Sequence, residues 1–380
     1  MFLLPIIPGR AATVFLNHSK PMTELSPMQV DVADRFTGLL LGTAVGDALG
    51  LPAENLSADK IRQRWHGEWK MRFIFGQGMI SDDTEHTLMI AQALLSQSQD
   101  AGAFQRAFAW KLRWWVIGLP AGVGLATAKS CIKLWLGFPP GKSAVISAGG
   151  GPAMRSAIIG AYFSSDPVRR KDFTLASARL THRSWQAETA ALAIAEAAAL
   201  AMNGQPEIST VLTMLGPLSV EPEWQRLLTQ IKTSLAAGHS TADFVQALDW
   251  KRGVTGYALH VVPVALYSWL RHPKDFRLAM SDALACGGDA DTVGAILGAL
   301  AGVSGGGQGI PSDWVNAIAE WPRSIGFMKK VAIRLDTLRI SGSPAGAVSY
   351  FWPGIIPRNL FFIIIVLLHG FRRLAPPWSI

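Results

Sequence analysis

Two short acidic clusters hold the side chains with the clearest potential for chemistry. The first is Ser81-Asp82-Asp83-Thr84, which follows a glycine-containing turn, and the second is Asp289-Ala290-Asp291-Thr292, which follows Gly287-Gly288. Each cluster precedes an apolar pattern with helical spacing, so each predicts the start of a helix. A helix N-cap uses one side chain, and Ser or Asp is favoured there. Each cluster offers two carboxylates and a hydroxyl, which is more than a cap requires.

Crowded carboxylates of this kind predict a bound cation, because proximity raises the pKa of one of them unless a cation neutralises the pair. The donors are all oxygens, which suit Mg²⁺ or Mn²⁺ better than zinc or copper. Two such ions within about 4 Å of each other can hold a substrate oxygen and activate water. The clusters therefore predict a hydrolase and leave phosphoester and glycosidic substrates open. The competing explanation for the first cluster is a simple cap, since Asp82 to Glu85 resembles a capping box.

Glycine spacing predicts how the two distant clusters meet. A helix predicted from Val32 to Gly50 has glycine at every fourth position, and a second from Thr292 to Gly302 repeats the pattern. Such faces allow two helix backbones to approach closely, so we expect these helices to pack on each other. If they run antiparallel, the end of the first at Asp47 meets the start of the second at Asp291. We expect Asp47 to orient a ligand or cap a turn rather than to bind metal itself.

The remainder of the chain also predicts helices, because alanine and leucine dominate and alternating β-branched runs are scarce. Further helices are predicted over Asp83–Ser96, Ala103–Val116, Trp185–Met202 and Val261–Leu270. The fold class is therefore all-α.

The helical patterns and the punctuating glycines and prolines divide the chain into three parts. We expect an N-terminal extension over residues 1–30, one helical domain over 31–338 and a hydrophobic tail over 339–380. Met22 and Met28 precede the first clear helix, and a translation start at either would remove most of the extension. The apolar stretch from Met1 to Ile7 contains a proline and lacks a basic flank, so we do not expect a signal peptide.

Composition excludes several classes of protein. A hydrophobic fraction of 49% with 16% charged residues excludes a disordered chain. The net charge of +8 comes from scattered basic residues rather than a dense basic arm, so no nucleic-acid partner is expected. Only Cys131 and Cys286 are present, which permits no disulfide framework or zinc spacing and predicts a reducing, cytoplasmic location. Cys286 lies close to the second acidic cluster, but a soft thiol suits hard cations poorly, so we expect it to be packed in the core.

The tail contains an almost wholly apolar run from Ile355 to Leu368, followed by Arg372 and Arg373. A membrane-spanning helix needs roughly 20 apolar residues, and this run is shorter. Two interpretations remain open. The tail lies in a membrane interface, which would make the protein membrane-associated, or it is a helix docked on the domain or on a second subunit.

Four motifs in order resemble those of the ADP-ribosylglycohydrolases, of the dinitrogenase-reductase-activating glycohydrolase type. They are Gly46–Glu54, Ser81–Thr84, Gly149–Arg155 and Gly287–Thr292. The resemblance covers roughly residues 31–302 and implies a compact orthogonal helical bundle with a binuclear Mg²⁺ or Mn²⁺ site. It implies cleavage of the glycosidic bond between ADP-ribose and a protein side chain or a small-molecule conjugate. Two alternatives stay open: a non-catalytic ADP-ribose binder and a two-metal phosphoesterase.

The resemblance also implies roles for individual residues. The implied catalytic residues are Glu54, Asp82 and Asp83. The implied substrate-binding residues are Gly149, Gly150, Gly151, Met154 and His182, with backbone N–H groups of the glycine loop receiving the diphosphate. The implied metal ligands are Ser81, Asp82, Asp83, Asp289, Asp291 and Thr292.

Two further segments have both a structural and a functional interpretation. The segment from Gly253 to Tyr257 fits either a simple turn or a contact to the nucleoside. Trp110, Trp114 and Trp115 could stack on adenine, but their helical spacing favours packing in the core.

Overall fold

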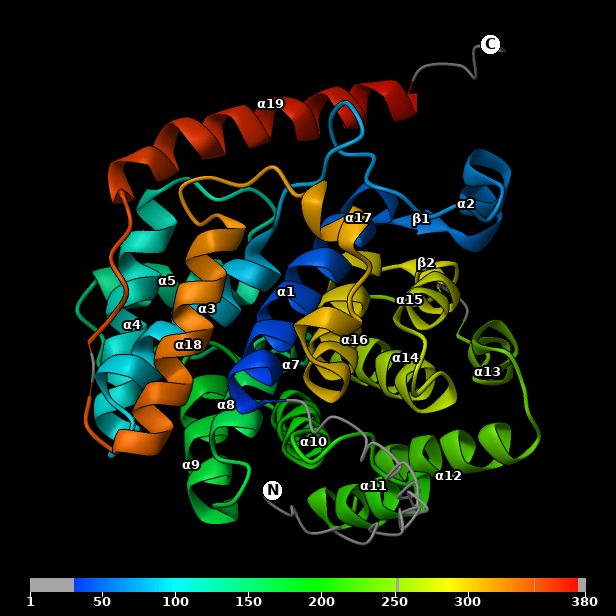
Figure 1. Ribbon diagram of the computed structural model, residues 1–380, viewed down its shortest axis with the longest axis horizontal. Helices are drawn as coiled ribbons and strands as arrows, with labels where there is room; N and C mark the ends of the chain where they lie inside the picture. Colours follow the sequence, from blue (N-terminus) through cyan, green and yellow to red (C-terminus); the bar gives the residue numbers. More distant parts are fainter. Residues whose placement is uncertain (1–30, 251–252, 345, 375–380) are drawn as a thin grey trace, which may run out of the picture.

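A computed structural model describes residues 31–250, 253–344 and 346–374. The predicted N-terminal extension, residues 1–30, lies outside the described residues. The described chain consists almost wholly of helices that pack against one another (Figure 1). The only two named strands in this part are β1 (Leu56–Ser57) and β2 (Gly287–Gly288), which pair antiparallel. The all-α prediction is confirmed.

Two glycine-faced helices form the centre of the fold, α1 (Val32–Gly50) and α16 (Ala290–Gly305). A Cβ atom built on Gly42 would lie 2.0 Å from the carbonyl oxygen of Gly298, and one on Gly46 would lie 1.9 Å from that of Gly294. These pairs run in opposite directions along the two helices, so the helices are antiparallel and in backbone contact. The predicted pairing is confirmed, and it places the end of α1 beside the start of α16.

The other helices cover this pair. The alanine-rich α10 (Trp185–Ala201) and α14 (Ala258–Arg271) are buried along most of their lengths, and α14 begins earlier than predicted, with Pro263 inside it. The helices that bear on the site or the tail are α3 (Asp82–Ser96), α4 (Ala101–Ile117), α7 (Gly151–Met154) and α18 (Ile325–Ser341). The remaining α-helices are α2 (Ala58–Trp65), α5 (Leu125–Trp135), α6 (Pro140–Ser143), α8 (Ala157–Tyr162), α9 (Pro167–Ala178), α11 (Ile208–Leu215), α12 (Pro222–Ala236), α13 (Thr241–Ala247), α15 (Phe276–Leu284) and α17 (Ser312–Asn316).

The hydrophobic tail forms a long helix, α19 (Ile355–Leu374), which crosses one side of the domain (Figure 1). Arg358 and Asn359, which interrupt its apolar run, are both buried. The Arg358 guanidinium bonds Glu320 at 2.5 Å and donates to the Ile80 carbonyl at 2.6 Å. The Asn359 amide donates to the Gly118 carbonyl at 2.7 Å. The prediction that the tail docks on the domain is confirmed, with polar side chains making the attachment.

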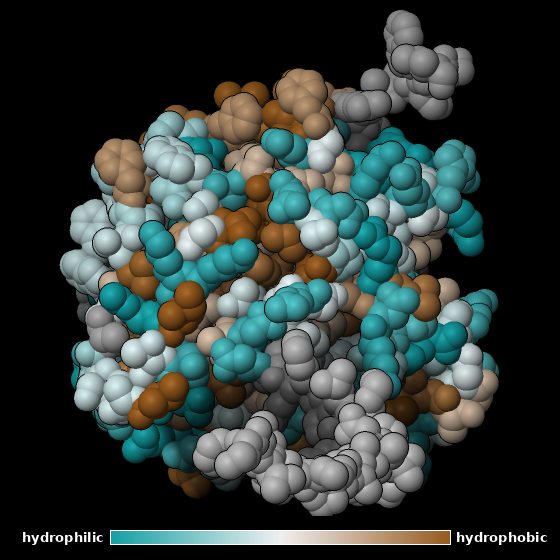
Figure 2. Space-filling view, viewed as in Figure 1, coloured by the Kyte–Doolittle hydropathy of each residue, from teal (hydrophilic) through white to brown (hydrophobic). Residues whose placement is uncertain are grey.

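The outer face of α19 remains apolar and uncovered by the described residues. Leu360, Phe361, Ile364, Leu367 and Leu368 are about half exposed, and brown and tan side chains gather along the upper edge of Figure 2, where α19 lies. By length and composition, Trp352–Phe371 and Val32–Ala53 could each cross a membrane, but the second is mostly buried and is the core helix α1. Contact of α19 with a membrane interface or a second subunit stays a prediction.

Replacing Arg358 with alanine is expected to lower the free energy of unfolding by about 3 kcal/mol, because Glu320 would lose the cation that neutralises it in a buried site. The urea midpoint of the full chain measures this. Arg339, an exposed arginine paired with Asp336 on α18, provides the control. Its replacement by alanine should cost less than about 1 kcal/mol. Equal midpoints for the two variants would contradict a role for Arg358 in fastening α19.

Candidate active site

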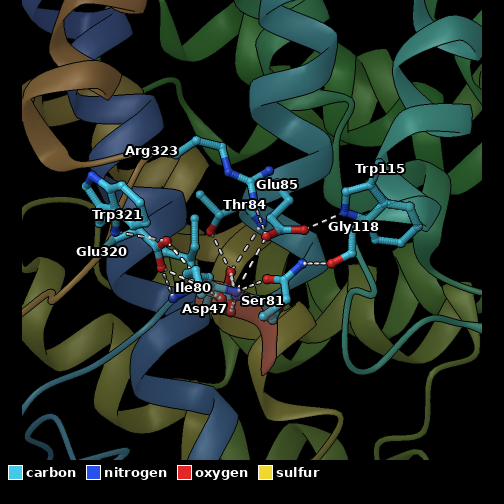
Figure 3. Close-up of polar contacts among 12 residues, drawn as sticks. Asp47, Ile80, Ser81, Thr84, Glu85, Trp115, Gly118, Glu320, Trp321 and Arg323 are labelled. Carbon is cyan, nitrogen blue, oxygen red and sulfur yellow. Dashed lines mark hydrogen bonds and ion pairs between the residues drawn. The ribbon is translucent and has the colours of Figure 1, made fainter. Parts of the chain in front are cut away.

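The first acidic cluster opens α3, and Asp47 of α1 caps it from outside. The Ser81 hydroxyl accepts the Asp83 amide at 3.3 Å, so Ser81 is the N-cap. Asp47 accepts the amides of Ser81 and Thr84, at 2.9 and 3.2 Å, and the Thr84 hydroxyl at 2.5 Å (Figure 3). The capping-box interpretation of Asp82 to Glu85 was therefore wrong, and the expectation that Asp47 caps a turn is confirmed. Because Ser81 and Asp47 cap the helix, the carboxylates of Asp82 and Asp83 are not needed as caps.

The second cluster opens α16. Asp289 occupies the N-cap position without making a side-chain cap bond. Gly287 and Gly288 before it have φ of 69° and 80°, a region that favours glycine, and a Cβ on Gly288 would lie 1.8 Å from the Val254 carbonyl oxygen. The same glycines form β2, which pairs with β1. Glu54 lies just before β1, so this strand pairing brings it to the second cluster. The sequence contains no strand signal that would have predicted this.

The two clusters face each other across one cavity of about 950 Å³. The Thr292 hydroxyl donates to Asp83 Oδ2 at 3.5 Å, which links α16 directly to α3. Of the predicted site residues, only Ser81 does not line the cavity; it lies behind Asp83, and its hydroxyl is 3.2 Å from Asp83 Oδ2. The predicted residues that line the cavity are Glu54, Asp82, Asp83, Gly149, Gly150, Gly151, Met154, His182, Asp289, Asp291 and Thr292.

The carboxyl groups raise one another's pKa values. Burial is the largest cause for Asp83 and for Asp291, whose pKa values lie well above the usual range. Asp82 and Asp47 add to the effect on Asp83, and Glu54 and Asp289 add to the effect on Asp291. Burial also raises the pKa of Asp47 to about 6, against the opposing effect of its hydrogen bonds. Negative charge in this cavity is thus costly unless protons or cations balance it.

These residues fit a hard divalent cation by donor type and electrostatics. Every candidate ligand is an oxygen, and Asp83 Oδ1 is buried without a hydrogen-bond partner in the described part of the chain. A buried carboxylate oxygen normally has such a partner. Within the same residues, no group of three or more His, Cys, Asp or Glu side chains stands closely enough to hold an ion as arranged. Side-chain adjustment would have to complete a metal site.

The glycine loop lines the same cavity as the acidic clusters and packs against His182. A Cβ on Gly151 would lie 3.0 Å from His182 Cε1, so this position leaves room for the ring. The expectation that exposed backbone N–H groups of this loop receive a diphosphate was partly wrong, because two of them already have partners. The Gly150 amide donates to the Gly256 carbonyl at 2.9 Å and the Gly149 amide donates to the Ser147 hydroxyl at 3.3 Å.

A buried arginine holds the histidine segment in place. Arg155 Nη2 donates to the Thr181 hydroxyl at 2.7 Å, and that hydroxyl lies 2.8 Å from His182 Nδ1. Burial lowers the pKa of His182 to about 3, with the Arg155 charge adding to the effect, so the ring is neutral at physiological pH. Burial also lowers the pKa of Arg155, to about 9.

The segment Gly253–Tyr257 was left open between a turn and a nucleoside contact, and residues 253–256 of it line the cavity. The structure also adds residues that the sequence did not single out, in the loop around Gly122 and Gly124, whose only signal was its turn composition. The expectation that Cys286 is packed in the core was wrong, because it is half-buried and lines the cavity; Cys131 is buried.

The three tryptophans of α4 have separate environments. Trp115 is buried in the core as predicted. Trp110 and Trp114 are 58% and 38% exposed, so their assignment to the core was wrong. None of the three lines the acidic cavity, so none contacts a ligand held there.

Comparison with known proteins assigns the family. The family model for ADP-ribosylglycohydrolase matches residues 28–341. A protein of Archaeoglobus fulgidus is 32% identical over 81% of this chain and 97% of its own. The ADP-ribosyl-dinitrogen reductase glycohydrolase of Rhodospirillum rubrum is 27% identical over 76% of this chain and 91% of its own. A solved structure described as an ADP-ribosylglycohydrolase-related protein complex superposes with a TM-score of 0.61 and 27% identity, covering 81% of this chain and 99% of the other. The chain belongs to the ADP-ribosylglycohydrolase family.

Proposed function

We propose that this protein is a divalent-metal-dependent hydrolase that cleaves the glycosidic bond between ADP-ribose and a protein side chain or small-molecule conjugate. The contact between Thr292 and Asp83 carries the proposal, since it joins the two acidic clusters, in which neither Asp83 nor Asp289 caps its own helix. Family membership supports hydrolysis of ADP-ribose conjugates in general. The cavity volume of about 950 Å³ lies within the range of ligand sites and suits a dinucleotide-sized group.

The position of each residue in the cavity determines the role that we propose for it. Asp82, Asp83, Asp289, Asp291 and Thr292 supply oxygens from both helix starts for two Mg²⁺ or Mn²⁺ ions, and Ser81 supports Asp83 from behind. Such ions, when bound, polarise ribose hydroxyls and lower the pKa of a water.

The other side chains act around this group. Glu54 sits where β1 begins and can accept a proton or orient the attacking water. Neutral His182 and the Gly151 amide face the same cavity and can bind the diphosphate-linked part of the substrate.

Release of intact ADP-ribose from modified protein, assayed with Mg²⁺ or Mn²⁺ and again after chelation, tests the function. A panel with arginine-, serine- and small-molecule-linked ADP-ribose identifies the leaving group. Turnover that disappears on chelation and returns with metal is expected. Binding of ADP-ribose by calorimetry without turnover of any linkage would favour a non-catalytic binder, and release of AMP would favour a phosphoesterase. Either result would overturn the proposal.

Metal should stabilise the protein more at pH 8 than at pH 5. The raised pKa values of Asp47, Asp83 and Asp291 mean that the folded state holds protons that the unfolded state has lost. The metal-free protein therefore loses stability as pH rises from about 4 through these raised values. Cations replace the protons at high pH and compete with them at low pH. Thermal unfolding with EDTA or Mn²⁺ at both pH values measures this. Equal shifts would contradict ion binding by these carboxylates.

A further inference from the structure

A second cavity, of about 400 Å³, lies on another side of α3 and shares no lining residue with the acidic cavity. Glu85, Leu88, Met89 and Gln92 of α3 form its floor, so one helix contributes to both cavities. Trp110, Trp114 and Trp115 of α4, Phe327 of α18, and Tyr350, Trp352 and Ile355 form its walls. Lys111 and Arg323 complete the lining.

The last wall comes from chain beyond residue 341, where the family match ends. Gln92, itself buried, fixes that segment with two hydrogen bonds. Its Nε2 donates to the Val348 carbonyl at 2.7 Å, and its Oε1 accepts the Val348 amide at 2.7 Å. The pair places Tyr350 opposite Phe327, with ring centroids 5.4 Å apart, and the chain then continues to Trp352, which is 5.8 Å from Trp114. The second cavity is thus a built feature of this chain's own tail.

The charged side chains in the lining of the second cavity carry a net positive charge. Both oxygens of Glu85 are already occupied, one by the Arg323 guanidinium and the other by the indole N–H of Trp115. Arg323 is 4% exposed, and its Nε has no hydrogen-bond partner among the described residues. In the same part of the chain, Lys111 makes no ion pair or hydrogen bond, and burial lowers its pKa. The lining therefore holds two cations for one carboxylate, and that carboxylate is fully bonded.

The walls of the second cavity are mostly aromatic side chains, which favour a ligand with an apolar body. Trp110 and Trp114 keep large aromatic surfaces open to solvent at the rim, which is unusual unless something covers them. Flat apolar groups pack well against the exposed faces and edges of such rings. A cavity of about 400 Å³ admits a body of two or three fused or linked rings.

We infer that this second cavity is a binding site for a small organic anion with a planar apolar body, such as an aromatic carboxylate or sulfonate. Lys111 and Arg323 receive the anionic group, and the tryptophans of α4 and the tail enclose the body. The site is separate from the proposed hydrolysis, because none of the residues that line it lines the acidic cavity.

Two fluorescent probes test the inference on the full chain. 8-Anilino-1-naphthalenesulfonate carries the anion, and N-phenyl-1-naphthylamine has the same rings without it. The sulfonate should bind once per chain, with energy transfer from tryptophan, and at least about tenfold more tightly than the neutral probe. Lys111→Met, which keeps an apolar side chain, should remove that preference. Trp352→Ala should weaken both probes. Lys274→Met, at an exposed lysine away from the cavity, is the matched control and should change nothing.

Three results would overturn the inference. Equal affinity for the two probes would show that the anion is not recognised. Displacement of the sulfonate by ADP-ribose would place it in the acidic cavity. Loss of binding in Ile364→Ser, on the exposed face of α19, with unchanged binding in Lys111→Met, would place it on the tail helix surface.

Discussion

Replacing Asp289 with asparagine is expected to lower the rate of ADP-ribose release by about 100-fold or more, which corresponds to about 3 kcal/mol of transition-state stabilisation. The same change should make the metal-free protein more stable. Asp289 makes no cap bond, and its negative charge helps raise the pKa values of Asp83 and Asp291. A neutral amide relieves that repulsion and removes one of the proposed cation ligands. Loss of activity with a gain in stability is typical of functional residues rather than structural ones.

Steady-state assays at saturating Mn²⁺ and thermal unfolding in EDTA measure the two effects of Asp289→Asn. Asp82→Ala on the opposite helix should lose activity to a similar extent. Asp172, an exposed residue of α9, is the control, and its replacement by alanine should leave both quantities unchanged. Full turnover by Asp289→Asn and Asp82→Ala would refute their assignment as ligands.

The second large effect is expected at a glycine, which has no side chain that could take part in the reaction. Gly42→Ala should destabilise the protein by more than about 3 kcal/mol, although alanine is the better helix former. The new Cβ would lie 2.0 Å from the Gly298 carbonyl oxygen, and no side-chain rotation can relieve a clash between two backbones. The helices α1 and α16 must then separate, which also separates the two acidic clusters.

Gly305→Ala provides the matched control, because it is the same change on the partner helix with no atom within 4 Å of the new Cβ. We expect a neutral or slightly stabilising effect there, of at most about 1 kcal/mol. Soluble yield and the thermal midpoint compare the two variants. A Gly42→Ala protein with the normal midpoint would show that the backbone contact is not required.

The sequence predicted those parts of the fold that depend on local pattern or on a repeated spacing. Glycine at every fourth position of two segments was sufficient to predict that the two helices pack on each other, and the antiparallel direction that the structure shows was left as a condition. Helix starts with more carboxylates than a cap needs were sufficient to predict which side chains face the cavity. Both signals exist because a helix has a fixed period.

Other features could not be predicted, because they join single residues that are distant in the sequence. Nothing local marks which helix start Asp47 caps, and nothing local marks Arg358 as the partner of Glu320. The two-residue strands β1 and β2 are too short for any alternating pattern. The amides of Gly149 and Gly150 looked free in the sequence, yet neighbouring loop atoms occupy them.

The backbone contact between α1 and α16 also bears on the order in which a growing chain acquires function. During synthesis α1 and α3 leave the ribosome first, while the helix that fills the glycine face of α1 follows only after most of the chain. Contacts of such high contact order form late, since a long loop must close before they give any stability. We expect nascent chains that end before Ala290 to expose the apolar flanks of α1 and to depend on chaperones. Metal uptake would then coincide with the last step of folding, so unfinished chains would have no hydrolytic activity.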